Sequence, residues 1–357
     1  MSTSRNINPF EFFLRTAEDH RPTHQFTGRT RAQFSAWQKK TLPAVLATAG
    51  RRPASVPAKP ELLVQWEEDG LIKERWILNT QRHLSVILLV FRPANLKRGE
   101  KRPAIFCSHG HGPHGKDPVM GLDFEPARQQ AIRDHNYDYG FQMAKQGFVT
   151  YSIDWLGFGE RDSRAKPHDL NKFGQRDACN VHYLCATMLG TTTMAINLHD
   201  ARVVTDFVAS QKYVDADNLG VMGLSYGGTM TTWLALDDKR YKAVNIICYS
   251  GPFRDIAFDT YNVCGSQLTP GLFELVDTFD LQGLIAPRPL LVEIGVHDRC
   301  FQVDHSLNRH YRPLEKIYAA AGASDKLELD LHPNDHAWGG NRSVAFFRRH
   351  LNAQWSA

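Results

Sequence analysis

From residue 104 onward, the chain alternates short apolar runs with segments that are long enough to form helices. The apolar runs span residues 104–108, 148–153, 219–224, 243–249, 290–296 and 327–331. Continuous apolar runs of this length are typical of strands covered by helices on both faces, and strands that alternate with helices form parallel sheets. The pattern therefore predicts an α/β fold with a mostly parallel, twisted sheet and helices on both of its faces.

The region before residue 104 follows a different pattern. Apolar runs at 62–66 and 72–78 flank Asp69-Gly70, which is a strong signal for a β-hairpin, and a third run covers 84–91. Because this hairpin is more polar than the later runs, we predict that it forms an antiparallel N-terminal edge of the sheet.

The hydrophobic pattern also suggests how the chain is divided. The first sixty residues look helical and irregular and end in a Pro-, Ala- and Arg-rich stretch at 51–60, which is typical of a linker. We therefore predict a helical appendage with its linker over residues 1–60 and a main α/β domain over residues 61–357. Two long irregular stretches at about 160–189 and 251–280 are expected to be cap-like insertions, since long loops in a compact domain are usually functional.

The pentapeptide Gly223-Leu224-Ser225-Tyr226-Gly227 carries the strongest chemical signal. It follows an apolar run and precedes a helix-like stretch, as in a nucleophile elbow, where a sharp turn lifts a serine above the sheet. Glycines two residues before and after the serine leave room for the tight crossing of the backbone. We therefore predict that Ser225 is a nucleophile, although an ordinary glycine-rich turn would show the same letters.

A serine hydroxyl needs a general base, and the base needs an orienting acid. His336 follows the run 327–331, and Asp298 lies just past the run 290–296, so the chain order is Ser, Asp, His. Glu293 competes with Asp298, but its place inside the strand favours a buried structural carboxylate. His332 competes with His336, but it lies at the strand end and is expected to pack or to order the loop.

An anionic tetrahedral intermediate also needs hydrogen-bond donors. One expected donor is the backbone N–H of Tyr226, the residue after the nucleophile. The second is the N–H of His111, in the His-Gly turn that follows the run 104–108, with the N–H of Gly112 as an alternative. The alternative, in which His109, His111 and His114 bind a metal, is disfavoured because no Asp/His pair follows at ligand spacing.

These motifs together resemble serine hydrolases of the α/β-hydrolase superfamily, within the dienelactone-hydrolase-like and acetyl-xylan-esterase-like bacterial esterases. The resemblance covers roughly residues 60–355 and rests on the stretches at 109–112, 154–161, 223–228, 285–291 and 336–338, together with Asp298. It implies the α/β-hydrolase fold and hydrolysis of carboxylic esters through an acyl-enzyme. Dienelactone hydrolases themselves resemble a cysteine-nucleophile pattern, so a serine here favours ester hydrolysis. The resemblance also implies that Asp154 is structural and shapes a turn beside the oxyanion loop.

Candidates for substrate contact come from the cap-like stretches and from the neighbourhood of the base. They are His182, Asn262 and Trp338, of which Trp338 is favoured because it lies two residues from His336. Three other functions remain open: a peptidase or amidase of the prolyl-oligopeptidase type, an acyltransferase, and a non-catalytic binding protein on a hydrolase scaffold. Sixty residues cannot form the propeller of the first, and a pure binder has no need of serine, acid and base together.

Composition narrows the remaining choices. A net charge of +4 over 357 residues is too weak to indicate nucleic-acid binding. The N-terminal residues lack the apolar stretch of a signal peptide, and no run has the length of a membrane-spanning helix, so we expect a cytoplasmic protein without membrane contact. The six cysteines show no C-x-x-C spacing, which indicates reduced thiols. The expected partner is a small-molecule ester, with no metal or organic cofactor, and a homo-oligomer is compatible with the sequence.

Overall fold

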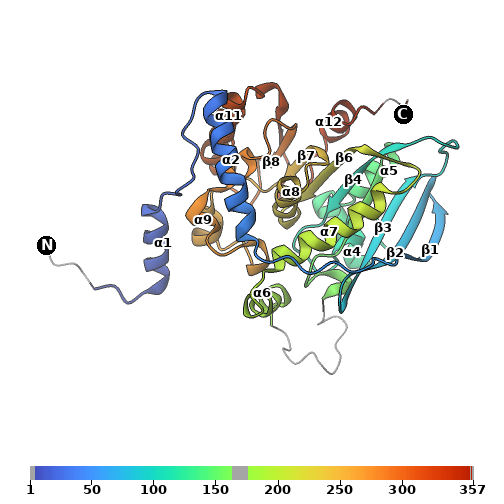
Figure 1. Ribbon diagram of the computed structural model, residues 1–357, viewed down its shortest axis with the longest axis horizontal. Helices are drawn as coiled ribbons and strands as arrows, with labels where there is room; N and C mark the ends of the chain where they lie inside the picture. Colours follow the sequence, from blue (N-terminus) through green and yellow to red (C-terminus); the bar gives the residue numbers. More distant parts are fainter. Residues whose placement is uncertain (1–4, 163–175, 354, 356–357) are drawn as a thin grey trace.

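A computed structural model describes residues 5–162, 176–353 and 355, and its centre is a single nine-stranded sheet (Figure 1). The strand order is β1-β2-β3-β5-β4-β6-β7-β8-β9. From β5 to β9 all neighbouring strands are parallel, whereas β1, β2 and β3 pair antiparallel with one another and β3 pairs antiparallel with β5. The predicted α/β-hydrolase architecture with an antiparallel N-terminal edge is confirmed.

Each apolar run identified in the sequence forms a strand. The strands are β1 Glu61–Glu68, β2 Leu71–Gln81, β3 Leu84–Pro93, β4 Arg102–Ser108, β5 Val149–Ile153, β6 Val214–Leu224, β7 Tyr241–Ile247, β8 Leu290–Gly295 and β9 Leu327–His332. The hairpin between β1 and β2 turns at Asp69-Gly70, where both residues have positive φ, 56° and 74°. Two successive residues with positive φ match the type I′ turn that Asp-Gly favours.

Helices cover both faces of the sheet, while the first helix of the chain lies away from it (Figure 1). In chain order, the described helices are α1 Pro9–Asp19, α2 Arg31–Thr48, α3 Lys116–Val119, α4 Pro126–His135, α5 Tyr139–Lys145, α6 Ala178–Met188, α7 Thr193–Ala209, α8 Tyr226–Asp237, α9 Leu272–Leu275, α10 Thr278–Gly283, α11 Arg312–Ala321 and α12 Ser343–His350. Short helical turns complete the set: 3-10 turns η1 Gly159–Arg161, η3 Gly265–Gln267 and η5 Ser324–Lys326, and π turns η2 Arg254–Asp259 and η4 His305–Tyr311.

The sheet divides the interior into two main apolar layers, and alternate side chains of each strand point into one layer or the other. The larger layer joins one sheet face to α2, α7, α8, α10 and α11, and the smaller joins the other face to α5 and α12. Phe106 on β4 belongs to the first layer, while its neighbours Ile105 and Cys107 belong to the second. This period of two is what a strand buried on both faces requires.

Helix α2 packs onto this core, whereas α1 is largely exposed and lies against η2. Helix α2 begins with a capping box between Thr30 and Gln33, and it buries Phe34 and Val45 in the larger apolar layer. Its Gln38 side chain donates to the carbonyls of Leu284 at 2.9 Å and Ala286 at 2.7 Å. The first sixty residues thus contain two helices, of which α2 shares the core of the sheet. The division into an appendage over 1–60 and a main domain over 61–357 remains a prediction.

The carboxyl ends of the parallel strands meet at one edge of the sheet. Strand β4 leads there into the loop at 109–115, β6 into Ser225, β8 into the loop that holds Asp298, and β9 into the loop that holds His336. Open α/β sheets bind their ligands at this edge. The topology thus brings together residues that are separated by more than a hundred positions in the chain.

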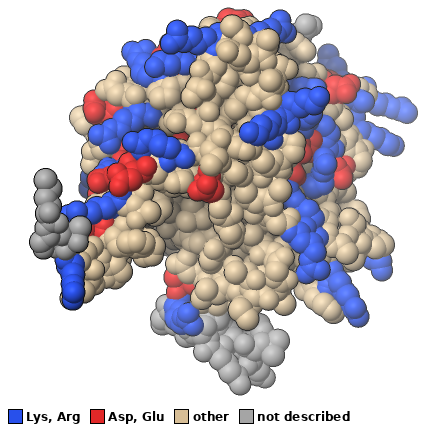
Figure 2. Space-filling model, turned by 60° about the vertical axis from the view of Figure 1, so that its left-hand side comes forward, with Lys and Arg blue, Asp and Glu red and all other residues tan. Residues whose placement is uncertain are grey.

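The distribution of charge on the surface does not point to one class of partner. On the face shown in Figure 2, Lys and Arg side chains lie in several separate groups among Asp and Glu residues. Among the described residues, no helix is long and apolar enough to cross a membrane. The expected location and the expected lack of a nucleic-acid partner remain predictions.

The turn after β6 fixes the packing at the centre of the sheet. A Cβ atom placed on Gly227 would lie 2.1 Å from the carbonyl oxygen of Ser108 at the end of β4. Because that neighbour is backbone, no side chain can move away to make room. Helix α8 can therefore approach β4 only with glycine at this position.

Gly227→Ala should consequently lower the melting temperature by roughly 1–4 °C, because overpacking against backbone costs about 1–3 kcal/mol and the entropy of unfolding of a chain this long is large. Gly112→Ala is the matched control, since a Cβ there would meet no atom within 4 Å. Equal melting temperatures for the two variants would contradict the packing described for the turn.

Candidate active site

Ser225 lies at the junction between β6 and α8 in a strained backbone conformation, with φ 61° and ψ −119°. Non-glycine residues rarely adopt positive φ, and such strain is concentrated at functional sites. Its N–H donates to the carbonyl of Ile247 at 2.9 Å, and its own carbonyl accepts from Gly228 N–H at 2.7 Å. The turn is therefore held from both sides, and Ser225 itself remains half-buried at its tip.

His336 and Asp298 form a hydrogen-bonded pair. The Nδ1 atom of His336 lies 2.9 Å from Oδ2 of Asp298, whose side chain is almost fully buried. The other carboxylate oxygen, Oδ1, accepts from the N–H groups of Cys300 at 2.7 Å and Phe301 at 3.0 Å. The Phe301 ring stacks on the imidazole with centroids 5.8 Å apart. The carboxylate is thus fixed by backbone donors, and the imidazole is held by its acid partner and by an aromatic face.

The competing carboxylate Glu293 occupies a separate buried network. It accepts from Asn245 Nδ2 at 2.7 Å, from Ser343 Oγ at 2.6 Å, and from the N–H groups of Gly339 and Gly340, both at 3.1 Å. Burial raises the pKa of Glu293 above its usual value. Its contacts are with β7, α12 and the loop after His336, as expected for a structural carboxylate.

The other competing residue, His332, is fully buried at the end of β9. A Cβ on Gly339 would lie 2.5 Å from its ring, which shows how closely the loop packs over it. Burial lowers the pKa of His332. The structure therefore places it as a packing residue under the loop that carries His336.

The loop after β4 is anchored by His109. The Nδ1–H of this buried residue donates to the carbonyl of Gly110 at 2.8 Å, and Nε2 accepts from the N–H of Trp155 at 3.0 Å. Burial lowers the pKa of His109 to about 4, so the ring is neutral near pH 7. Both ring nitrogens are engaged, which leaves none to bind a metal together with His111 and His114.

The same loop approaches the nucleophile closely. Gly110 donates its N–H to the hydroxyl of Tyr137 at 2.5 Å, and a Cβ on Gly110 would lie 3.4 Å from Cβ of Ser225. Tyr226 is the first residue of α8, and first-turn N–H groups have no acceptor within their own helix. Backbone donors from two elements are therefore available beside Ser225, although an oxyanion role for His111 and Tyr226 remains a prediction.

A buried ionic cluster supports the other side of this loop. Asp154 accepts from the Lys116 N–H at 2.8 Å and from Lys116 Nζ at 2.7 Å, and Nζ also contacts Glu160 at 2.7 Å. Arg75 donates to Glu160 at 2.5 Å. Burial opposes the charge of Glu160, but Lys116 and Arg75 outweigh it and lower its pKa to about 2. Asp154 therefore has the structural role that the family resemblance implies.

The candidate residues open onto one cavity of about 180 Å³. Ser225 and His336 line it together with the loop at 110–115. His135 and Tyr137 also line it, and the Nδ1–H of His135 donates to the carbonyl of His336 at 2.6 Å. Sequence reasoning missed these last two residues, whose only signal is the aromatic and polar stretch at 135–139 before α5.

The three candidates for substrate contact do not line this cavity. Trp338 is 2% exposed, and its indole N–H donates to Ser343 Oγ at 2.9 Å, so the favoured candidate is a core residue. Asn262 is exposed and donates to the carbonyl of Cys300 at 2.6 Å, next to the loop of Asp298. His182 lies half-buried on α6. Part of the first cap-like stretch, residues 163–175, lies outside the described residues.

Two curated proteins of Bacillus subtilis (strain 168) are similar in sequence. The hydrolase candidate YtaP is 24% identical over 282 residues, which cover 77% of this chain and 84% of YtaP. The uncharacterized peptidase YuxL is 25% identical over 314 residues, which cover 82% of this chain but only 39% of YuxL.

Comparison with solved structures and family models agrees with the fold. An acetyl xylan esterase candidate from Bacteroides fragilis superposes with a TM-score of 0.76 at 18% identity, covering 98% of this chain and 91% of that one. At this identity the likeness concerns the fold alone. The model of the Abhydrolase family matches residues 2–330, and the chain therefore belongs to the Abhydrolase family.

Proposed function

We propose that the protein is a serine hydrolase of carboxylic esters, with Ser225 as nucleophile, His336 as general base and Asp298 as the orienting acid. The observation that carries this proposal is the 2.9 Å contact between His336 and Asp298 at the cavity that Ser225 also lines. YtaP is named as a hydrolase candidate and the B. fragilis protein as an acetyl xylan esterase candidate, and both names support the same class of reaction.

The hydrogen bond to Asp298 determines which tautomer the neutral imidazole adopts. A carboxylate can only accept, so the proton of neutral His336 lies on Nδ1 and leaves Nε2 as the base. Ser225 Oγ then attacks the ester carbonyl carbon while its proton passes to Nε2. Asp298 stabilises the imidazolium that forms, and its own position is fixed by the Cys300 and Phe301 N–H groups.

Collapse of the tetrahedral intermediate completes acylation. The N–H groups of Tyr226 and His111 would stabilise the negative oxygen, and His336 would return its proton to the leaving alcohol. Water then attacks the acyl-enzyme with His336 again as base, which releases the carboxylic acid and restores Ser225. Each proton taken up is returned, so the cycle balances without a metal or an organic cofactor.

Cavity size favours a small acyl group. The volume of about 180 Å³ is below the range of roughly 300–1,000 Å³ that is typical of pockets for drug-sized ligands. We therefore propose short acyl groups, such as acetyl, as the preferred substrates. The similarity to YuxL keeps an amidase or peptidase activity as the second candidate.

Ser225→Ala should fold normally and lose ester hydrolysis by several orders of magnitude, because no nucleophile remains. The double variant Ser225→Ala/His336→Ala should lose little more, since the members of a triad act as a unit. Steady-state hydrolysis of p-nitrophenyl acetate measures both. Retained turnover in Ser225→Ala would contradict the mechanism, and additive losses would identify another base.

Two carboxylate-to-amide changes separate the acid from the structural carboxylate. Asp298→Asn should lower kcat by roughly three to four orders of magnitude, because the amide cannot hold the required tautomer of His336. Glu293→Gln places an NH₂ group among four donors and should cost about 1–3 kcal/mol of stability with little effect on kcat. Thermal unfolding and kcat are measured for both variants. A kinetic loss confined to Glu293→Gln would reverse the assignment.

A substrate panel tests the class of bond and the size of the acyl group. We expect kcat/KM to fall by roughly tenfold or more from p-nitrophenyl acetate to the octanoate ester, because a cavity of about 180 Å³ has little room for six further methylene groups and each methylene can change binding by about 1–3 kcal/mol. An aminoacyl anilide is included to report amidase activity. Activity confined to the anilide would favour the peptidase, and a preference for octanoate would contradict the small acyl site.

A further inference from the structure

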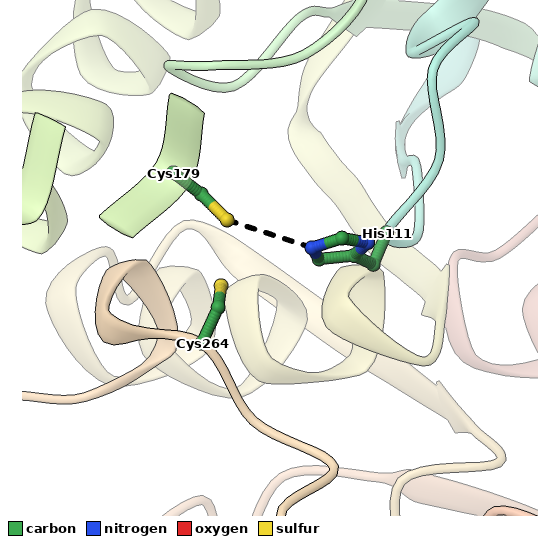
Figure 3. Close-up of side chains that lie close together, drawn as sticks. All are labelled: His111, Cys179 and Cys264. Atoms are coloured by element: carbon green, nitrogen blue, oxygen red, sulfur yellow. Dashed lines mark hydrogen bonds between the residues drawn. The ribbon is translucent and has the colours of Figure 1, made fainter. Parts of the chain in front are cut away.

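Two thiols and one imidazole from three separate segments converge beside the catalytic cavity. His111 comes from the loop after β4, Cys179 from the start of α6, and Cys264 from the residue before η3. Figure 3 shows the two sulfur atoms and the imidazole directed toward a common space. Their ligand atoms all lie within 4.8 Å of one another.

We propose that His111, Cys179 and Cys264 form a zinc-binding site. Thiolate sulfur and imidazole nitrogen are the donors that zinc prefers, whereas magnesium and calcium select oxygen. Tetrahedral zinc, with Zn–S near 2.3 Å and Zn–N near 2.0 Å, places its sulfur and nitrogen ligands about 3.5 Å apart. The Sγ atom of Cys179 lies 3.5 Å from Nε2 of His111. The donors therefore have the identity that zinc prefers, and the Cys179–His111 pair has the spacing of two ligands of a tetrahedral ion.

A carboxylate adjoins the cluster. The Asp177 oxygens lie 3.0 and 3.2 Å from Cys179 Sγ. We assign three protein ligands and leave the fourth position to water or to Asp177. Both sulfurs are buried, at 1% exposure for Cys179 and 9% for Cys264, while His111 is exposed and lines the cavity. An ion could thus enter from the cavity side, and the sulfurs would be shielded once it is bound.

The segments that carry the two cysteines are already tied together. The Gly265 N–H donates to Asn180 Oδ1 at 2.7 Å, which links the residue after Cys264 to the residue after Cys179. Asp177 caps α6 by accepting from the Cys179 N–H at 3.3 Å, and Cys264 N–H donates to Gln267 Oε1 at 3.0 Å. Because the thiols are positioned by neighbouring hydrogen bonds, binding would order few additional groups.

The ion would connect the loop at 109–115 to both cap-like stretches. Binding of the ion does not depend on ester hydrolysis. Its effect on catalysis rests on the proposed function, because the His111 N–H is the proposed oxyanion donor. Holding the His111 ring would position that N–H beside Ser225. The sequence offered only His109 and His114 as further ligands beside His111, and a metal was therefore not expected. The fold instead brings two cysteines to His111.

Cobalt(II) is the probe that reports thiolate ligands directly. The full-length protein is stripped with a chelator under reducing conditions, checked for six titratable thiols after denaturation, and titrated with Co²⁺. We expect one Co²⁺ per chain, a near-ultraviolet thiolate-to-cobalt absorption band, and displacement by one equivalent of Zn²⁺. Zn²⁺ should also raise the melting temperature of the stripped protein.

Cys179→Ser and Cys264→Ser should each weaken Co²⁺ binding by roughly 100-fold or more and abolish the rise in melting temperature. Cys185→Ser is the matched control, because Cys185 is an exposed thiol on the same helix α6. Circular dichroism shows whether each variant folds. If either Cys179→Ser or Cys264→Ser does not fold, the remaining cysteine variant and His111→Ala are used to test Co²⁺ binding.

Three results would overturn the proposal. They are the absence of stoichiometric Co²⁺ binding to protein with six free thiols, an absorption band that survives both cysteine substitutions, and a Cys179–Cys264 disulfide found by mass spectrometry in protein purified without oxidant. Ester hydrolysis is measured separately on the same samples. Failure of metal binding and failure of the proposed hydrolysis are therefore distinguishable.

Discussion

The structure depends above all on the backbone contact between the turn after β6 and the end of β4. Gly227 approaches the Ser108 carbonyl so closely that no side chain could stand there, and a Cβ on Gly223 would lie 2.5 Å from the Gly227 carbonyl oxygen. This approach forces Ser225 into positive φ and directs it to the edge where the parallel strands end. Both the position of the serine and the start of α8 are tied to this contact.

Two buried polar networks hold the loops that complete the site. Lys116, Asp154 and Glu160 fix the loop after β4, while Glu293 binds the loop that follows His336. Burial disfavours the Lys116 ammonium, but its surrounding carboxylates outweigh that cost and raise its pKa. Breaking one partner of such a cluster leaves an uncompensated buried charge, so these residues are expected to matter for the geometry of the site without touching substrate.

Much of the fold could be predicted from the sequence because its central strands, such as β4, β5 and β8, are buried on both faces and read as continuous apolar runs. The Asp69-Gly70 turn was predictable for a local reason, since its two residues accept positive φ. Glu293 and Asp298 could be distinguished in advance because one lies inside a strand and the other beyond its end. These inferences need only local pattern and the direction of parallel strands.

The remaining features depend on contacts between distant segments, which spacing along the chain does not encode. The stacking of Phe301 on His336 and the hydrogen bond from Gly110 to Tyr137 arise only when separate loops fold against one another. Trp338 is close to His336 in sequence, which suggests contact with substrate, but its own side chain is buried in the core. The cysteine and histidine cluster was hidden for the same reason, since its members lie on three segments.

The central claim is that Ser225 is the residue that becomes acylated. Peptide mass spectrometry after reaction with an organophosphonate tests it most directly, because the adduct mimics the tetrahedral intermediate and stays on the attacking atom. The account predicts one adduct per chain, located on Ser225 and absent after substitution of His336 by alanine. An adduct on another residue, or an unmodified Ser225 in an enzyme whose esterase activity has been inhibited by the reagent, would contradict it.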